Sequence, residues 1–570
     1  MTNEEFDGLV LEVESPLIKS IEKQSDKVYN FELQGKNKLW NVRVNCSYGF
    51  PFRLPSAKLL NSDVIGSIPH VNFEGVICVE ESDSILLDYK RPIDLICYFV
   101  EEVIRLLDRS SLKIFRSELT DEYEGYFQSS LPIINSFYEA SSFLQKVNLR
   151  IAFRDNYRLR DAEPLLLYGN DGQLPRQFSN IKSLDEHQNI NIIHIPLLKP
   201  VLPPKNNQKI SSNYILEILN FVSKENNIIL QKLLQKEKQN RHFFILISMP
   251  RSEGERSQIL IRFSSSFPKS HPLISRENHS DFKIDAYLLD RNDKSYLIER
   301  GGGDHSLVTK KVSIIGCGSV GSEITLMLAK AGIGEFTLID FDLLNSDNIY
   351  RHRLGGLSLN YSPNKKKTIV KCQSKVRALA TLLRVDFPYI RVNPKATSYE
   401  YLLKDNEFLN SDVVIVAVGS PTLSLKINKT LKKLGLNKII FCWNEAAGVG
   451  GHSVSFDLDK SCYECLYSDD NSFTMNCSLS LLEIGQNISK NITGCAGVFT
   501  PFSYLDSSQT AILAAKDCIS MLLNNKNSQA TTWKGDNRSN LKLSERFELI
   551  SDKESVEIIQ QKGCNICNGR

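Results

Sequence analysis

Hydrophobic and polar positions along the first 125 residues follow two different periods. Short runs such as "VYNFELQ" (28–34) and "LWNVRVN" (39–45) alternate with a period of two, which is typical of strands that bury one face. The run "PIDLICYFVEEVIRLLDR" (92–109) repeats its apolar residues every three to four positions, which predicts an amphipathic helix. We therefore expect residues 1–125 to form a small α+β domain with an antiparallel sheet.

The next region, residues 126–300, mixes both periods. Strand-like runs such as "HFFILIS" (242–248) accompany a long helical stretch over 213–239 and a proline-rich joint, "KPVLPPKNN". We expect an α/β middle domain here. It holds no constellation of chemically active residues, so its expected role is spacing or docking.

From Val312 the pattern becomes strand–helix–strand, "VSIIGCGSVGSEITLMLAKAGIGEFTLIDFD", after a joint at "GGGDHSL" (301–307). This pattern predicts a βαβ unit of a parallel, doubly wound sheet in a domain over residues 301–570. A polar stretch from about 523 to 545 is expected to be a mobile loop.

A glycine-rich turn stands between the first strand and helix of this domain. Gly316, Gly318 and Gly321 form the pattern GxGxxG, in which glycine permits a tight turn and close approach to a phosphate at a helix N-terminus. Asp340 ends the next strand, where a carboxylate can accept hydrogen bonds from ribose hydroxyls. Taken alone, these residues also suit a dinucleotide-dependent dehydrogenase.

The continuation "LIDFDLLNSDNIYRHRLG" brings Asp340, Asp342, Asn348 and Arg351 into close succession. This succession resembles the HesA/MoeB/ThiF superfamily, the adenylating fold of ubiquitin-activating enzymes. The resemblance implies a Rossmann-like adenylation domain that binds ATP and Mg²⁺. It implies that Asp340 binds the ribose, while Asn348 and Arg351 contact the phosphates. Arginine is a strong donor to a phosphate group, so its expected role is chemically apt.

The family also has a lysine ahead of a helix, and Lys375 in "SKVRALATLLRVDFP" is the candidate. Lys367, in a lysine run expected to be a solvated loop, is the runner-up, and Arg300 is a weaker candidate for an arginine finger. Many relatives carry a Thr-Asp pair whose aspartate helps to hold magnesium. Gly419 stands in that place here, which leaves the magnesium ligands open.

Two CxxC pairs stand out among the thirteen cysteines, namely Cys462–Cys465 and Cys564–Cys567. Cys465 and Cys564 are 99 positions apart in the sequence. Four cysteine thiolates suit the tetrahedral coordination of Zn²⁺. We expect a structural four-cysteine zinc site that pins the C-terminal segment to the adenylation domain. The superfamily often has its second pair near the C-terminus, as here.

Between the zinc pairs lies "NITGCAGVFTPFSYLDSSQTAILAAKDCISML". In activating relatives a cysteine of this segment attacks the acyl-adenylate, and Cys495 matches that position. A cysteine thiolate is a strong nucleophile and its thioester stays reactive. Cys477 is the alternative, and Cys518 on an apolar helix face is expected to be core.

The N-terminal stretch "PHVNFEGVICV" (69–79) ends close to Cys78, which out of context would be interpreted as a buried strand cysteine. Together with the turn "YGFPFRLP" it resembles the active-site region of ubiquitin-conjugating enzymes, with Gly75 and Cys78 in register. The resemblance implies that Cys78 carries a thioester. The family's asparagine, which stabilises the oxyanion, is replaced by His70, which could donate the same hydrogen bond; Asn72 is a nearby alternative.

A conjugating-like domain joined to an activating-like domain resembles bacterial fused enzymes of CBASS anti-phage operons. This resemblance implies a thioester relay: adenylation of a protein C-terminal carboxylate, transfer to Cys495, then to Cys78, then ligation to a target amine. The implied partners are a cGAS/DncV-like nucleotidyltransferase or a ubiquitin-like protein, the target protein, and a second copy in a homodimer. A sulfur-carrier activator and a nucleotide-binding scaffold with structural cysteines are the alternatives.

Charge and hydropathy narrow these possibilities further. The net charge of +3 comes from interspersed charges of both signs, so we expect no nucleic-acid partner. No apolar run approaches the roughly 20 residues that span a bilayer. The acidic start "MTNEEFDGLVLEVES" lacks the features of a signal peptide. We therefore expect no membrane partner and a cytoplasmic location.

Overall fold

The protein is described from a computed structural model. It describes residues 3–567 apart from the segments 80–84, 116, 129, 157–158, 170–186, 205–207, 253, 275–280, 365–366, 372, 388, 403–408, 458–459, 470–474, 493–497 and 525–527. The described chain divides into two compact units between residues 293 and 294. Among the described helices, we find none with the length and apolar character that crossing a membrane requires.

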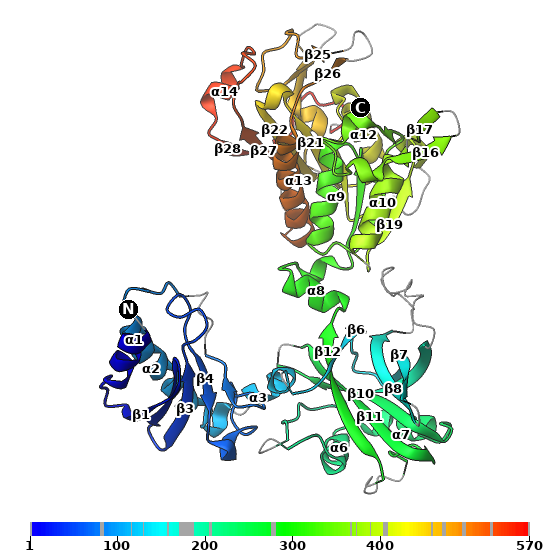
Figure 1. Cartoon of the computed structure of the whole chain (residues 1–570). Coiled ribbons are helices and arrows are strands. Elements are labelled where there is room, and N and C mark those ends of the chain that lie inside the picture. Colours follow the sequence, from blue (N-terminus) through cyan, green and yellow to red (C-terminus); the bar gives the residue numbers. More distant parts are fainter. Residues whose placement is uncertain are drawn as a thin grey trace. The chain divides into compact units, whose positions relative to one another are not determined.

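The first unit begins with an antiparallel sheet of order β1-β2-β3-β4-β5, covered by the long helix α2 (Figure 1). In β2 every second residue is buried, and α2 packs Phe99 and Val103 into the same core as Trp40. The predicted antiparallel sheet and helix are therefore confirmed. The elements are α1 (Asn3–Leu11), β1 (Ile18–Ser25), β2 (Val28–Gln34), β3 (Leu39–Asn45), β4 (Ser56–Leu59), β5 (Val76–Ile77), α2 (Pro92–Ser110), α3 (Glu118–Asp121) and α4 (Tyr123–Tyr126).

The same unit continues into a closed barrel of order β10-β11-β12-β6-β8-β7-β9. The helical stretch predicted over 213–239 is two helices. The second helix begins after Ser223, whose hydroxyl oxygen accepts a hydrogen bond from the backbone N–H of Asn226. The core between α2 and its sheet is continuous with the outer face of β10 and β11. The elements are β6 (Ile133–Phe137), β7 (Gln145–Asn156), β8 (Leu159–Tyr168), β9 (His187–Pro196), α6 (Ser212–Leu219), α7 (Lys224–Leu234), β10 (Asn240–Pro250), β11 (Arg256–Lys269) and β12 (Lys283–Arg291).

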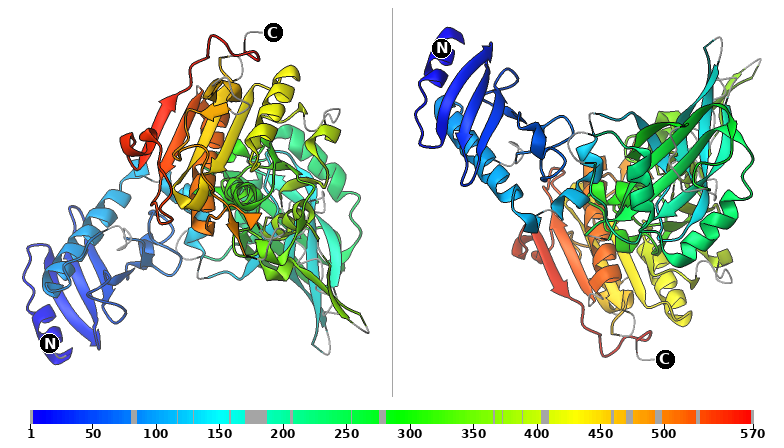
Figure 2. Two further views of the ribbon diagram at one scale, coloured as in Figure 1. Left: turned by 90° about the horizontal axis from the view of Figure 1, so that it is seen from above. Right: turned by 90° about the horizontal axis from the view of Figure 1, so that it is seen from below.

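The second unit is built on a sheet of order β19-β14-β13-β20-β21-β22-β27-β28. Its first five strands are parallel, which confirms the predicted βαβ arrangement, and the last three are antiparallel. The orange and red strands of the antiparallel part lie side by side in Figure 2. The elements flanking and forming this sheet are α8 (Lys294–Arg300), β13 (Lys311–Ile315), α9 (Ser319–Lys330), β14 (Glu335–Ile339), α10 (Lys375–Asp386), β19 (Arg391–Lys395), β20 (Val413–Val416), α12 (Pro421–Lys433), β21 (Lys438–Asn444), β22 (Gly450–Asp457), α13 (Tyr504–Asn524), β27 (Gln529–Lys534), α14 (Glu545–Leu549) and β28 (Lys553–Glu557).

Part of the stretch expected to be a mobile loop, 523–545, is an inner strand of this sheet. Strand β27 buries Ala530 and Trp533, and the Trp533 indole N–H donates to Thr510 of α13 over 2.8 Å. The prediction of a loop was wrong because a strand that pairs on both edges can carry polar residues. The shorter pairs in this unit are β15 (Leu343–Leu344) with β18 (Gln373–Ser374), β16 (Asn360–Asn364) with β17 (Lys367–Lys371), β23 (Tyr467–Asp469) with β24 (Met475–Cys477), and β25 (Lys490–Asn491) with β26 (Val498–Phe499).

Candidate functional site

The glycine-rich turn joins β13 to α9 and is shaped by its lack of side chains. Gly316 has a φ of +90°, which a residue with a side chain rarely adopts. A Cβ atom on Gly321 would lie 1.9 Å from the carbonyl oxygen of Gly316, so only glycine fits there. Gly318 precedes α9 as its N-cap and leaves the first backbone N–H groups of the helix open to an anion.

Asp340 closes this turn from the end of β14. Its Oδ2 accepts a hydrogen bond from the backbone N–H of Cys317 (2.8 Å), and its Oδ1 accepts one from the backbone N–H of Asp342 (2.8 Å). Both carboxylate oxygens are therefore fixed in direction by backbone donors. A carboxylate fixed in this way can accept from ribose hydroxyls without a further loss of side-chain freedom.

A cavity of about 350 Å³ lies over the carboxyl ends of these parallel strands, which is where open α/β sheets bind ligands. Gly419 and Ser420 form part of its wall. The predicted site residues that line the cavity are Gly316, Gly318, Asp340, Asp342 and Lys375. Asn348 and Arg351 are not among its lining residues, and they lie on the loop that follows β15.

Lys375, the first residue of α10, points its ammonium group at the cavity carboxylate. Its Nζ lies 2.8 Å from Oδ2 of Asp342, and its side chain is only 11% exposed. Its backbone N–H also donates to the Asp342 carbonyl. Lys367, the runner-up, belongs to β17, and its side chain is outside the described residues. Lys375 is thus a sheltered cation beside an open cavity, as a phosphate-binding lysine should be.

The loop that carries Asn348 and Arg351 is fastened to the glycine turn by His352. The buried His352 ring donates from Nε2 to the carbonyl of Cys317 (2.8 Å) and accepts from the Leu354 N–H at Nδ1 (3.0 Å). Burial lowers the pKa of His352 to about 4, so the ring is neutral. The Oδ1 of Asn348 accepts from the Asn345 N–H in a capping box, which fixes the side chain of Asn348 at the start of this loop.

Arg351 stacks its guanidinium 5.4 Å from the ring centre of Phe502, just before α13. This contact brings the phosphate-contacting arginine expected from sequence to the end of the segment that holds Cys495. Cys495 itself lies outside the described residues. The alternative, Cys477, is half-buried, and burial raises the pKa of its thiol to about 11. Cys518 is buried, as expected.

The four cysteines of the two CxxC pairs lie together. Their sulfur atoms are all within 4.8 Å of one another, with 3.6 Å between Cys462 and Cys564 and 3.7 Å between Cys465 and Cys567. Tetrahedral zinc with Zn–S bonds of about 2.3 Å requires sulfur separations of roughly 3.8 Å, so the arrangement fits Zn²⁺.

A polar atom beside this cluster supports the same interpretation. Asn428 of α12 is fully buried and accepts at Oδ1 from the Tyr463 N–H (3.2 Å). This bond fixes the amide, and the Asn428 side chain also forms a hydrogen bond with the Cys462 thiol. Metal-bound thiolates accept such N–H groups, so Asn428 is a candidate to orient a zinc ligand.

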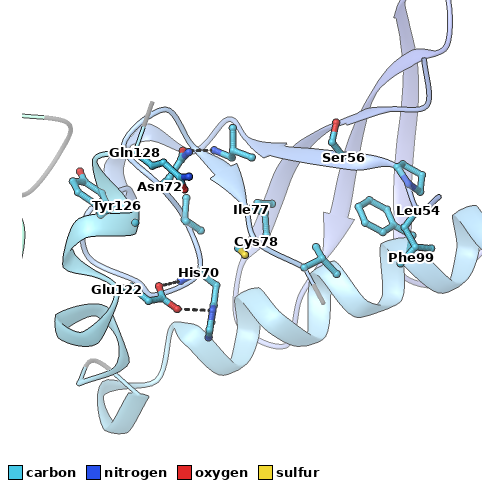
Figure 3. Close-up of a pocket in the computed structure, with 15 residues that line it drawn as sticks. Leu54, Ser56, His70, Asn72, Ile77, Cys78, Phe99, Glu122, Tyr126 and Gln128 are labelled. Carbon is cyan, nitrogen blue, oxygen red and sulfur yellow. Dashed lines mark hydrogen bonds and ion pairs between the residues drawn. The ribbon is translucent and has the colours of Figure 1, made fainter. Parts of the chain in front are cut away.

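Cys78 follows the short strand β5 and opens onto a second cavity of about 480 Å³ (Figure 3). Of the eleven described cysteines it alone is exposed. The interpretation of Cys78 as a buried strand cysteine is therefore wrong. Its backbone N–H donates to the carbonyl of His70 (2.8 Å), so these two residues are held side by side.

His70 and Asn72 line the same cavity, and both ring nitrogens of His70 and the side-chain oxygen of Asn72 are already engaged. The His70 ring contacts Glu122 through Nδ1 (2.8 Å) and Glu118 through Nε2 (3.1 Å). This arrangement differs from the expected donor role, because neither ring nitrogen is left for a thioester oxygen. The Oδ1 of Asn72 accepts from the backbone N–H groups of Glu74 and Val76.

Sequence reasoning missed Glu118, Glu122 and Asn428, and it matched His352 to the family pattern without assigning it a contact. The first two are four positions apart, a spacing that brings side chains together on one helical face, and this was the available signal. Nothing in the local sequence indicates that His352 contacts Cys317 or that Asn428 contacts Tyr463, because each pair is 35 positions apart.

Comparisons with known proteins bear on the second unit. Residues 293–556 match the family model of the ThiF family. The chain is 25% identical over 242 residues to "ATP-dependent ubiquitin transferase-like protein Cap2" of Escherichia coli (strain TW11681), which covers 41% of this chain and 38% of that protein. It is 28% identical over 169 residues to "Adenylyltransferase and sulfurtransferase UBA4" of Vanderwaltozyma polyspora, which covers 29% of this chain and 35% of that protein.

Among solved structures, a crystal structure of E. coli MccB with succinimide aligns at 20% identity and a TM-score of 0.33, covering 48% of this chain and 69% of MccB. The chain spans less than half the length of the two sequence relatives described above.

Proposed function

We propose that this chain uses ATP to activate the C-terminal carboxylate of a protein. The proposal starts from the match of residues 293–556 to the ThiF family. One observation carries the proposal: the fixed carboxylate of Asp340, the glycine turn and the sheltered Lys375 line one cavity within the matched range. The cavity, the open helix N-terminus and the lysine fit a nucleoside triphosphate.

In the first step a carboxylate oxygen of the protein tail attacks the α-phosphorus of ATP. A mixed anhydride forms and pyrophosphate leaves. Lys375 and Arg351 lower the energy of this step by stabilising charge on the phosphate oxygens. Mg²⁺ would neutralise part of the triphosphate charge when bound. Asp342 is the carboxylate nearest to Lys375 that could hold it, since Gly419 offers no side chain.

The second part of the proposal is a thioester relay. The Cys495 thiolate attacks the acyl carbon and AMP leaves; the Cys78 thiolate then attacks this thioester and frees Cys495. A target amine finally attacks the Cys78 thioester, forms an amide, gives up a proton and releases the Cys78 thiolate. Each thioester keeps the acyl group activated until the amine arrives. The exposure of Cys78 beside a cavity supports the last two steps.

The bound partners follow from the same chemistry. Similarity to a protein named ubiquitin transferase-like Cap2 supports a protein C-terminus as the group that is activated. We propose that this C-terminus belongs to a cGAS/DncV-like nucleotidyltransferase in anti-phage defence. We further propose that Cys462, Cys465, Cys564 and Cys567 hold a structural Zn²⁺. The expected homodimer stays a prediction.

The test is ATP–pyrophosphate exchange by the full chain with a partner protein. The probes are a cGAS/DncV-like nucleotidyltransferase and a ubiquitin-like protein, each also prepared without its last residues. We expect exchange that depends on the intact tail and a thiol-sensitive adduct on a non-reducing gel. Cys495→Ala should abolish the adduct and keep exchange. Exchange without any tail dependence would refute tail activation.

A second candidate function is activation of a sulfur carrier, which similarity to a protein named adenylyltransferase and sulfurtransferase favours. This function needs the nucleotide and zinc sites but not Cys78. If Cys78→Ala leaves the complete activity intact, the sulfur-carrier function holds. If that variant accumulates the Cys495 adduct without a ligated product, the relay holds.

A further inference from the structure

The backbone that presents Cys78 depends on an unusual residue, His70. His70 has a φ of +63°, in the left-handed region that residues other than glycine seldom occupy. Its carbonyl accepts from the Cys78 N–H, and its own N–H donates to Oε2 of Glu122 (2.8 Å). A residue held in this region needs its surroundings to fix it there, because the conformation is intrinsically unfavourable.

The ring of His70 supplies the second half of this fixation. Glu122 lies at one ring nitrogen and Glu118 at the other, and Arg109 contacts the far oxygen of Glu118 (2.7 Å). Carboxylates only accept hydrogen bonds, so both ring nitrogens must donate, which requires the protonated imidazolium. Hydrogen bonding to Glu122 accordingly raises the pKa of His70. The two cations, His70 and Arg109, balance the charge of the two carboxylates, Glu118 and Glu122. The His70 side chain is 25% exposed.

The carboxylates stand on a helical segment that the barrel anchors. Between α3 and α4 the segment turns, and Glu124 accepts from the Gln258 N–H of β11 (2.6 Å). Asp121 accepts from both the N–H and the hydroxyl of Ser252, in the loop between β10 and β11. Phe73, near Cys78, stacks edge-on with Tyr126 of α4. The barrel therefore fixes the position of the segment that holds His70.

We propose that His70 is a positioning residue for Cys78, clamped between Glu118 and Glu122 on a segment that the middle barrel keeps in place. Its ring holds the turn at residues 70–78 and does not donate to the reacting thioester. The barrel is thereby part of the Cys78 site. The part of this inference that concerns thioester transfer rests on the proposed function. The part that concerns the turn stands by itself.

The clamp should make the rigidity of the turn at residues 70–78 depend on pH. Deprotonation of His70 removes one N–H donor and leaves a carboxylate facing a ring lone pair. The charged groups that face the ring are Glu122 and Glu118, with Arg109 behind Glu118. The turn should therefore loosen as the pH rises through the pKa of His70, which lies above that of an ordinary histidine.

The first test is amide hydrogen exchange in the full chain, followed on peptides that cover residues 70–79. His70→Gln and Glu122→Gln should accelerate exchange in these peptides by about tenfold or more, since a charge-assisted hydrogen bond contributes roughly a factor of ten or more. Glu74→Gln is the matched control, because it makes the same chemical change in the same turn on an exposed side chain. Unchanged exchange around Trp40 would show that the variants fold.

The pH profile separates positioning from a general loss of stability. In the unchanged protein, exchange at 70–79 corrected for its intrinsic rate should rise as the pH passes through the pKa of His70. In His70→Gln this rise should be absent. Identical corrected profiles for the two proteins would overturn the inference, whatever the proteins do to ATP.

The second test concerns transfer. Cys78 charged with its acyl group is mixed with free lysine, and the loss of the thioester is timed. Glu122→Gln should slow this loss about tenfold while ATP–pyrophosphate exchange stays unchanged, since the same charge-assisted bond is lost. His70→Asn separates the two roles of the residue. Full transfer in His70→Asn, with amide exchange at 70–79 no faster than in the unchanged protein, would make His70 a replaceable hydrogen-bond donor and refute the clamp. If no charged Cys78 forms in any variant, the proposed relay fails, while the exchange result still decides the clamp.

Discussion

Acidification should loosen the nucleotide site through His352. The ring is buried, donates to the Cys317 carbonyl and accepts from the Leu354 N–H, so a second ring proton has no place. Burial holds its pKa at about 4, against 6.5 for an ordinary histidine. A lowered folded pKa means that the unfolded chain takes up the proton first. The contribution of this ring to stability is therefore complete above about pH 6.5 and falls as the pH drops toward 4.

The size of the effect follows from the two pKa values. At a pH of about 5 the unfolded ring is almost fully protonated and the folded ring is mostly neutral. The linkage relation then gives a loss of about 2 kcal/mol relative to a pH of about 7.5, which is roughly a thirtyfold change in the folded-to-unfolded ratio. The loss concerns the loop from Asn348 to Leu354, so ATP affinity should decline along with the stability of the second unit.

The assay is urea unfolding of the full chain by tryptophan fluorescence at about pH 7.5 and about pH 5, the two conditions of the linkage argument. Two of the three tryptophans, Trp443 and Trp533, lie in the second unit. Carboxylates titrate over the same range, so the quantity to compare is the difference between the protein and His352→Gln. The unchanged protein should lose about 2 kcal/mol more than the variant. Equal losses in both would refute the assignment of a neutral, buried ring.

Three further outcomes are expected. Gly321→Ala should abolish ATP binding by calorimetry because its Cβ meets a backbone oxygen at 1.9 Å, whereas Gly419→Ala, whose Cβ meets no atom within 4 Å, should bind normally. Metal analysis should find about one zinc per chain, and Cys564→Ser should lose it and unfold at lower temperature; a metal-free, equally stable protein would contradict the four-cysteine site. Lys375→Met should reduce ATP–pyrophosphate exchange about a hundredfold and Lys367→Met should not; the reverse result would transfer the phosphate contact to Lys367.

Several residues that line the cavity over the parallel strands could be grouped from the sequence, because they are close in the chain or mark strand ends. The glycine turn, Asp340 and Asp342 all belong to one βαβ unit, whose geometry is local. Lys375 could be found from its place before a helix. The cysteine pairs are distant from each other, yet their chemistry identifies them without any knowledge of the fold.

Contacts between distant segments could not be predicted in this way. Glu118 and Glu122 reach His70 across 48 and 52 positions, and no local pattern indicates which histidine an acidic pair will bind. The closed barrel depends on parallel pairing of β12 with β6 and of β10 with β9, which periodicity does not specify. Strand β27 looks polar in the sequence because it contains Thr531 and Thr532. It is nevertheless an inner strand, because both residues pair with β22 on one edge and with β28 on the other.

The free edges of the larger sheets bear on how this protein behaves at high concentration. An exposed strand edge presents backbone groups that a strand of another molecule can pair with. The barrel closes on itself, whereas β19 carries Pro394, which lacks an N–H, and β28 alternates exposed Lys553 and Glu557 with partly buried residues. In the first sheet, β5 is two residues long and β1 carries charges along its exposed side. These sheets thus end in short or charged strands within the described chain, and we expect the protein to resist edge-to-edge aggregation even when crowded.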